Sequence, residues 1–296
     1  MKTNLSLRAP EISYRNPLLP RPLGVAVMLY ILGASVSVQA EQVPLWELGF
    51  GITGLSIPDY RGSDERSGYA LPLPYVIYNG DLLKVDRKGV YSRLFDSERV
   101  RIEMSADASV PVKSDDNTAR QGMPDLDPTF EIGPSIEICI SSTCKAKQTW
   151  MIRIPLRAVI ATDFSHANGA GWVINPHINF DTTNVGPDGG WNFGVAAGPI
   201  FASQAFHEYY YGVAPEFATA TRPAYRARGG YSGFRIASAV SKRYDDLWVG
   251  VFARYDDLSG VAFDDSPLLR VKRSFLAGFG VAWVFARSST LVEAPP

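Results

Sequence analysis

The sequence predicts an all-β fold: a single antiparallel transmembrane β-barrel of the outer-membrane type, with about twelve strands. Three observations indicate this fold. Apolar residues alternate with polar or small ones over stretches of about 10 to 13 residues, a length that suits tilted strands crossing a bilayer. The connections between the stretches are alternately short and long. Trp and Tyr residues lie at the ends of several stretches, where a membrane meets water.

The first 40 residues have the features of a secretory signal peptide. Four basic residues precede an apolar run over 23–34, and small residues before Glu41 form a cleavage-site pattern. The run is shorter than the roughly 20 residues of a spanning helix, and an uncleaved anchor is the alternative. We therefore expect a signal peptide over 1–40, an outer-membrane barrel over 41–285 and a C-terminal tail over 286–296.

The last apolar stretch, 274–285, shows the alternation most clearly. Phe275, Phe279 and Trp283 share one face, whereas Gly278 and Gly280 lie on the other. Successive side chains of a strand point to opposite faces, so one face would contact lipid and the other a narrow interior. A strand of a soluble sandwich has the same period, but the strand lengths, loop pattern and aromatic positions favour the membrane barrel.

The remaining strands follow from the same alternation and from the turns between them. The tight-turn sequence at 79–81 separates the second strand from a short hairpin centred on 87–89. That hairpin makes the count twelve, and ten is the alternative if it is not embedded in the membrane. An even count returns both chain ends to the periplasmic side. The predicted strands cover 46–52, 70–78, 82–86, 90–95, 100–110, 130–138, 150–160, 172–180, 191–201, 234–240, 247–255 and 274–285.

Connections of two lengths alternate along the chain, as between the periplasmic and outer sides of such barrels. The longest loop, 204–229, is expected to cap the outer mouth, with a helical turn at 215–220. Four prolines lie inside predicted strands, where the missing N–H predicts bulges: Pro134, Pro155, Pro176 and Pro199. The short turns lie near 79–81, 96–98, 142–147, 184–189 and 243–246, and the long loops at 58–69, 111–127, 162–170, 204–229 and 257–270.

The faces opposite the apolar ones carry charges of both signs, together with one histidine. Two interpretations stay open for them. The charges form an internal salt-bridge network that fills the barrel, because unpaired charges away from water are costly, or they form a constriction that selects solutes. The residues predicted to point into the lumen are Arg101, Glu103, Asp107, Glu131, Glu137, Arg153, Arg157, His177, Asp181, Arg235, Arg254 and Asp256.

The two cysteines, Cys139 and Cys144, flank a short predicted turn. In an oxidising compartment such a pair forms a disulfide across the turn. Two free thiols are the alternative. The spacing, with no nearby histidine or third cysteine, gives little support to a metal site.

The sequence gives no basis for an enzyme, a cofactor, a metal site or a nucleic-acid partner. Lys and Arg number 29 and Asp and Glu number 30, so the formal charge is −1. His166 and His207 fall in loops, and no motif places a serine beside His177, as nucleophilic catalysis requires. Oxygen ligands suit a hard cation, but the four loop aspartates match no metal-loop spacing: Asp115, Asp116, Asp125 and Asp127.

An ordered set of motifs resembles the MipA/OmpV family of outer-membrane proteins. The segments are 58–64 (PDYRGSD), 71–75 (LPLPY), 93–97 (RLFDS), 114–117 (SDDN), 120–128 (RQGMPDLDP), 211–213 (YGV) and 223–225 (PAY). They run in order between residues 46 and 285, over nearly the whole mature chain. Each motif alone is weak, and the ordered set is specific.

The resemblance implies a barrel in the outer membrane, in contact with its lipid, and brings no catalytic residues with it. It implies a scaffold that joins the lytic transglycosylase MltA to a bifunctional penicillin-binding protein, or else a small-solute porin. It also implies an assembly signal formed by Gly280, Trp283 and Phe285. Barrels of this type usually end at the aromatic residue that is Phe285 here, so the tail 286–296 departs from the family pattern.

Overall fold

The computed structural model describes residues 42–80, 83–86, 89–141, 143–144, 146–163, 165–187 and 189–293. The chain divides into two compact units, 1–39 and 40–296. The predicted signal peptide lies outside the described residues, so all that follows concerns the second unit.

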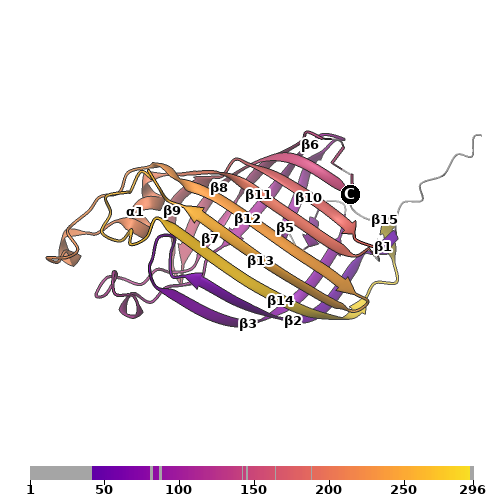
Figure 1. Cartoon of the computed structure of the whole chain (residues 1–296), viewed down its shortest axis with the longest axis horizontal. Helices are drawn as coiled ribbons and strands as arrows, with labels where there is room; N and C mark the ends of the chain where they lie inside the picture. Colours follow the sequence, from indigo (N-terminus) through magenta and orange to yellow (C-terminus); the bar gives the residue numbers. More distant parts are fainter. Residues whose placement is uncertain are drawn as a thin grey trace, which may run out of the picture. The chain divides into compact units, whose positions relative to one another are not determined.

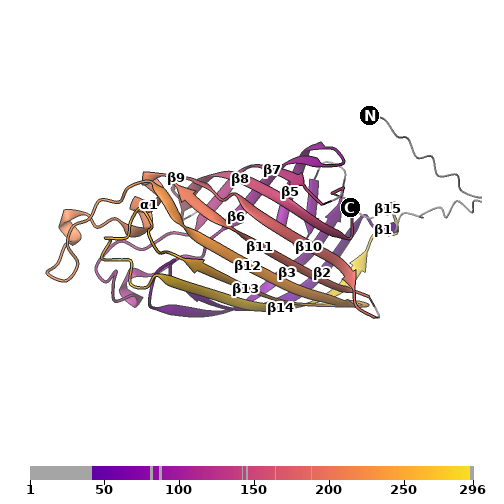
Figure 2. The ribbon, with the colours of Figure 1, turned by 45° about the horizontal axis from the view of Figure 1, so that its top comes forward.

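The second unit is built on one closed antiparallel sheet, in which the last strand pairs with the first (Figures 1 and 2). β8 and β11 each pair with both β9 and β10, so these two short strands occupy one position in the ring. The thirteen strands of the sheet thus fill twelve positions, and the predicted barrel is confirmed. The strands are β2 (Trp46–Pro58), β3 (Arg66–Asn79), β4 (Leu83–Asp86), β5 (Gly89–Asp96), β6 (Val100–Ala108), β7 (Thr129–Cys139), β8 (Gln148–Thr162), β9 (Ala167–Ile174), β10 (His177–Val185), β11 (Trp191–Ala202), β12 (Gly230–Tyr244), β13 (Leu247–Asp257) and β14 (Arg273–Arg287).

Proline interrupts the sheet at some of the expected places and not at others. The predicted continuous strand 172–180 is broken between β9 and β10, at Asn175 and Pro176, because proline has no N–H for the ladder. A register shift also follows Pro199. The prediction of bulges at Pro134 and Pro155 is wrong, because β7 and β8 pair in the same register on both sides of these residues.

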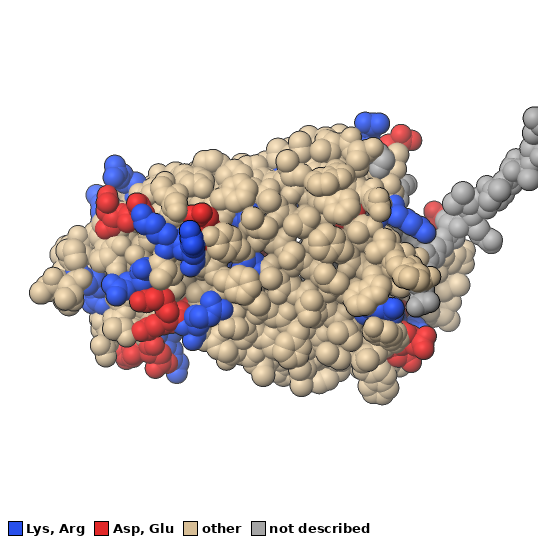
Figure 3. Space-filling model, in the orientation of Figure 1, with Lys and Arg blue, Asp and Glu red and all other residues tan. Residues whose placement is uncertain are grey.

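The outward side chains form an apolar surface between two charged ends. Figure 3 shows one face on which Lys, Arg, Asp and Glu gather near the ends and only small charged patches are visible between them. On β14, Phe279 is 52% exposed and Trp283 60%, whereas Val284 and Ser274 point inward and are buried. Such an exposed apolar band is stable only against lipid.

The two ends of the barrel carry different structures. At one end, the loop between β6 and β7 includes the helix η1 (Ser114–Asp116), and the loop between β11 and β12 includes α1 (Gln204–Tyr211) and η2 (Pro215–Phe217). At the other, the turns are short, and β1 (Gln42–Pro44) pairs with β15 (Leu291–Glu293) to form a ribbon outside the ring. Part of the predicted tail 286–296 is therefore an ordered strand. No described helix combines the length and the apolar character needed to cross a membrane.

Replacing Phe279 by arginine tests whether the exposed face of β14 contacts lipid. A charge near the middle of the apolar band should lower the free energy of unfolding by about 2–4 kcal/mol. Denaturant titration of vesicle-inserted protein measures the change, with Phe279→Leu as the control expected to change it by less than about 1.5 kcal/mol. Equal stability of the arginine and leucine variants would contradict the lipid contact.

Candidate functional site

One buried carboxylate in the lumen gathers three arginines. Asp256 of β13 is 1% exposed. Its side chain lies 2.7 Å from Nε of Arg235, 3.1 Å from Nε of Arg254 and 3.6 Å from Nε of Arg61. Arg235 stands directly across from Asp256 in the register of β12 and β13. Arg61 comes instead from the loop between β2 and β3, so this cluster ties a long loop to the barrel wall.

A second charged cluster joins β6, β7 and β8. Nε of Arg157 lies 3.0 Å from Glu131, and its guanidinium lies 3.8 Å from the half-exposed Asp107. Glu131 and Asp107 are opposite each other in the register of β6 and β7. Like charges placed opposite each other repel, and the arginine between them offsets that repulsion.

A row of polar residues runs across neighbouring strands nearer the short-turn end. Arg101 is opposite Glu137, Glu137 is opposite Arg153, and Arg153 is opposite His177. Arg153 forms an ion pair with Glu137, whereas Arg101 pairs with Asp96 at 3.1 Å. Each arginine of the row therefore has a carboxylate partner.

The other predicted lumen residues lie close to this row. The ring Nδ1 of His177 is 2.7 Å from the carbonyl oxygen of Asn175. Asn179 donates a hydrogen bond of 2.8 Å to Asp181, and Glu103 on β6 is buried. The predicted lumen residues therefore lie near one another on the inner face of neighbouring strands.

Sequence reasoning missed a charged cluster at the short-turn end. Glu47 is 2.6 Å from Nη1 of Arg243 and 3.7 Å from Nε of Arg287. Glu47 lies between the outward residues Trp46 and Leu48, and this alternation is the signal that places it inward. Arg287 lies beyond Phe285, in the segment expected to be a tail.

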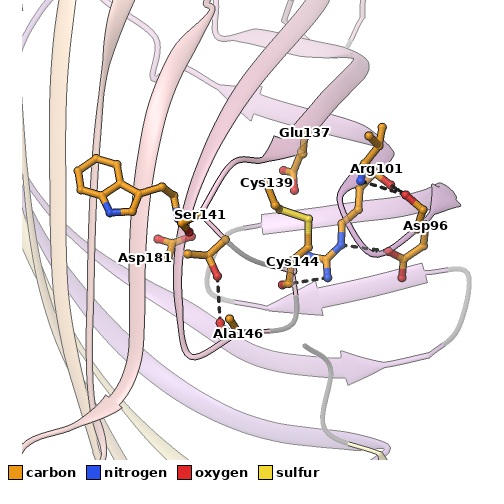
Figure 4. The surroundings of a disulfide bond; sticks show 12 residues. Asp96, Arg101, Glu137, Cys139, Ser141, Cys144, Ala146 and Asp181 are labelled. Carbon is orange, nitrogen blue, oxygen red and sulfur yellow. Dashed lines mark hydrogen bonds and ion pairs between the residues drawn. A yellow bond between two sulfur atoms is a disulfide. The ribbon is translucent and has the colours of Figure 1, made fainter.

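Cys139 and Cys144 form a disulfide beside this end of the barrel (Figure 4). Their Cα atoms are 5.4 Å apart, and both side chains are buried against Met151. Arg101 donates a hydrogen bond of 3.1 Å to the carbonyl oxygen of Cys144. The disulfide and this arginine together hold Cys144 against the wall.

At the long-loop end the loops pack into a hydrophobic cluster, which we call the loop core. Tyr211 and Phe263 stack at its centre, with ring centroids 3.7 Å apart. Apolar side chains from four different loops pack together at this end of the barrel. The loop core consists of Tyr60, Val112, Leu126, Tyr211, Val213, Leu258, Val261, Phe263 and Leu268.

Hydrogen bonds between loops satisfy the polar groups of the loop core. The Tyr211 hydroxyl donates to the carbonyl oxygen of Arg61 at 2.8 Å. The Tyr60 hydroxyl donates to that of Leu268 at 2.8 Å, and the Ser266 hydroxyl to that of Tyr211 at 2.7 Å. Because these bonds join segments far apart in sequence, the loops form one packed unit. The expectation that loop 204–229 caps the mouth agrees with this packing.

Helix α1 lies just inside the wall. Its residue Phe206 packs with Val159 of β8, Val173 of β9 and Ile200 of β11. The neighbours of Val173 on the lipid face, such as Trp172, are exposed, so this cluster belongs to the inner face. The helix is therefore anchored inside the mouth of the barrel.

His207 of α1 is completely buried beside the loop core. Its Nδ1–H donates to the carbonyl oxygen of Arg228 at 2.6 Å, and its ring lies 4.6 Å from that of Phe263. Its Nε2 has no hydrogen-bond partner among the described residues. Burial lowers the pKa of His207 below its ordinary value of 6.5, with the nearby Arg61 acting in the same direction and the Arg228 carbonyl opposing both.

The predicted assembly residues lie on the last strand of the ring. Trp283 and Phe285 point outward and have ring centroids 6.2 Å apart. Gly280 faces inward beside the Trp248 ring. Their role in assembly stays a prediction.

The loop aspartates do not form a metal centre in the structure. Asp125 accepts a hydrogen bond of 2.7 Å from the main-chain N–H of Ser114. Within the described ranges, no group of three or more His, Cys, Asp or Glu side chains is placed to hold a metal ion.

Comparisons with known proteins give a family and distant structural neighbours. A family model described as MltA-interacting protein MipA matches residues 50–285. The outer membrane protein Omp26La of Vibrio anguillarum is 22% identical over 271 residues, 88% of this chain and 93% of that protein. A NanC porin aligns with a TM-score of 0.35 and 9% identity over 79% of this chain and 98% of that one. A Pseudomonas aeruginosa FadL homologue aligns with a TM-score of 0.31 and 9% identity, over 81% of this chain and 68% of that one.

Asp256→Asn tests the three-arginine cluster. Removing the shared carboxylate leaves buried guanidinium groups without their partner, so the free energy of unfolding should fall by about 3–5 kcal/mol. The matched control is Asp264→Asn, which breaks an exposed pair with Lys272 and should cost less than about 1 kcal/mol. Denaturant titration in vesicles measures both, and similar losses for the two variants would contradict the assigned role.

The lowered pKa of His207 predicts that acid weakens the packing of the long loops around the loop core. When the loops unpack, His207 is exposed and binds a proton more readily. The contribution of His207 to the stability of the loop core is therefore present above about pH 6.5 and is lost as the pH falls below it. Near-ultraviolet circular dichroism of the aromatic loop core should weaken between pH 7.5 and 5. His207→Asn keeps a donor for Arg228 and should flatten this pH profile, whereas His166→Asn, in an exposed loop, should not. A wild-type spectrum that does not change with pH would refute the prediction.

Proposed function

The chain belongs to the MipA family and is a β-barrel protein of the outer membrane, and from this premise we propose that it is a non-enzymatic scaffold. In this proposal its periplasmic end holds a lytic transglycosylase of the MltA type together with a penicillin-binding protein. The chain reaches the membrane after secretion and loss of residues 1–40.

The observation that carries the proposal is the loop core at the outer mouth. Nine buried apolar side chains from four loops leave little reason to assign passage of solutes as the main activity. The charges beneath it are paired in the clusters around Asp256 and Arg157. The family description, an MltA-interacting protein, names a partner class instead of a solute.

The periplasmic end offers an ordered surface for such a partner. The β1–β15 ribbon stands outside the ring and exposes Leu291, which is 53% accessible. The disulfide between Cys139 and Cys144 links two further residues at the short-turn end. A pre-ordered surface binds with a smaller entropy cost than mobile chain ends would.

Removing residues 288–296 should therefore weaken the binding of a purified MltA-type transglycosylase. The deletion takes away β15 and leaves β14 complete. We expect an affinity at least about tenfold lower, a change of about 1.4 kcal/mol, measured by biolayer interferometry on nanodisc-embedded protein. The control deletes the exposed outer-loop residues 218–221 and should bind as the intact chain does. Failure of the intact chain to bind would contradict the scaffold, and equal binding after removal of 288–296 would contradict the role of the ribbon.

A small-solute channel is the second candidate function, because charged side chains project into the lumen beneath the loop core. If the loop core alone prevents solutes from passing through the barrel, replacing 205–226 by a short Gly-Ser linker should let small sugars enter. Proteoliposomes with the shortened chain should then swell in small sugars, whereas those with the intact chain should not. A shortened chain that folds and stays impermeable would remove the channel from consideration.

A further inference from the structure

The cluster around Asp256 holds more positive charge than its carboxylate balances. The Nε atoms of Arg61, Arg235 and Arg254 all lie within 3.6 Å of that carboxylate. Among the described residues, no second carboxylate forms an ion pair with any of the three arginines. Three positive charges against one negative charge leave a surplus of two inside the barrel. Because uncompensated charge away from water is costly, an anionic ligand would stabilise this cluster.

The second charged cluster offsets only part of the surplus. Glu131 and Asp107 lie close enough to attract Arg235, but both already pair with Arg157. The two clusters together hold four arginines against three carboxylates and keep one positive charge. Half of the Asp107 side chain is exposed, and water screens an exposed charge more than a buried one. The potential beside Asp256 therefore favours an anion.

Two of the three arginines keep part of their side chains accessible. Arg254 is 30% exposed and Arg235 20%. Arg254 donates no hydrogen bond to any described residue, because its Nε lies near Asp256 without hydrogen-bonding geometry. Arg61, in contrast, donates to the hydroxyl and the main-chain carbonyl of Ser232. A guanidinium group presents N–H donors in a planar fork, which fits the paired oxygens of a carboxylate or a phosphate.

The inner face beside Arg254 is accessible from the lumen. Phe252 lies two residues before Arg254 on β13 and therefore shares its face. This large apolar side chain is 37% exposed although it faces the inside of the ring. Its exposure indicates that water reaches this level of the barrel, and a small ion can follow the same route to the arginines.

We propose that Arg235 and Arg254 bind a small oxyanion inside the barrel. Asp256 holds the two guanidinium groups side by side, and the charge of Arg61 strengthens their attraction for the anion. The oxyanion accepts hydrogen bonds from the accessible donors of both arginines and balances the surplus charge. This site goes beyond the proposed function, because a scaffold at the periplasmic end does not depend on it.

Inorganic phosphate is a suitable probe, since it is small and carries acceptor oxygens on every side. The vesicle-inserted chain is unfolded by urea at rising phosphate concentrations, with sodium chloride keeping the ionic strength constant. A ligand that binds only the folded chain stabilises it by RT ln(1 + [L]/Kd). The urea midpoint should therefore rise with the logarithm of the phosphate concentration once that concentration exceeds the Kd.

Arg254→Gln removes the most accessible guanidinium group and leaves Asp256 paired with Arg235. Its apparent affinity for phosphate should be at least about tenfold lower, which corresponds to about 1.4 kcal/mol. Arg254→Lys keeps the charge but lacks the planar fork. Its affinity should be several-fold lower, and this variant decides the question if Arg254→Gln does not fold, as judged by heat modifiability. Unchanged affinity in the lysine variant would then overturn the proposal.

The matched control is Arg243→Gln, which removes an inward arginine at the other end of β12. Glu47 keeps Arg287 as a partner in this variant, and the phosphate affinity should equal that of the unaltered chain. Phosphate also stabilises proteins in general because it is excluded from their surface, and the control shows the same general gain. Equal phosphate dependence of Arg254→Gln and Arg243→Gln would overturn the proposal.

Discussion

The structure depends on one constraint: inside a bilayer, every main-chain N–H and C=O must find its partner within the protein. The ring of β2 to β14 meets this demand by closing on itself, since β14 pairs with β2. Closure fixes which side chains face lipid and which face the lumen. Large apolar residues such as Phe279 point outward, and charged residues such as Asp256 point inward. The inward charges pair across adjacent strands, as Arg157 does with Glu131 and Arg235 with Asp256, and these pairs in turn support the wall.

The two ends of the closed barrel carry different structures. At the outer end, long loops with apolar side chains come together into the loop core, and Arg61 links that core to the Asp256 cluster below. At the periplasmic end, the turns are short and the chain ends form a ribbon. Between β3 and β4 the paired stretch is short, with Tyr78 opposite Val85 and Asn79 opposite Lys84.

Alternation along the sequence was enough to predict the barrel and its twelve positions, because a strand alternates over neighbouring residues alone. It did not predict the break at Asn175 and Pro176, where one proline splits a strand, nor the unchanged register at Pro134 and Pro155. It missed Arg61 and Glu47 as lumen residues. Arg61 lies in a loop without periodicity, and its partner Asp256 is 195 residues away in the chain. For the loop core, the sequence predicted only that loop 204–229 covers the outer mouth. The packing of four loops together depends on contacts between distant residues, which no local sequence pattern shows.

The central claim is that the intact barrel is closed at its outer mouth and acts through its periplasmic surface. Single-channel recording of the refolded mature chain in a planar bilayer tests this claim most directly. With folding verified by heat modifiability, the account predicts no discrete openings at neutral pH across the usual voltage range. Regular openings of constant size from the folded, intact chain would contradict the closed mouth and would make transport its main activity.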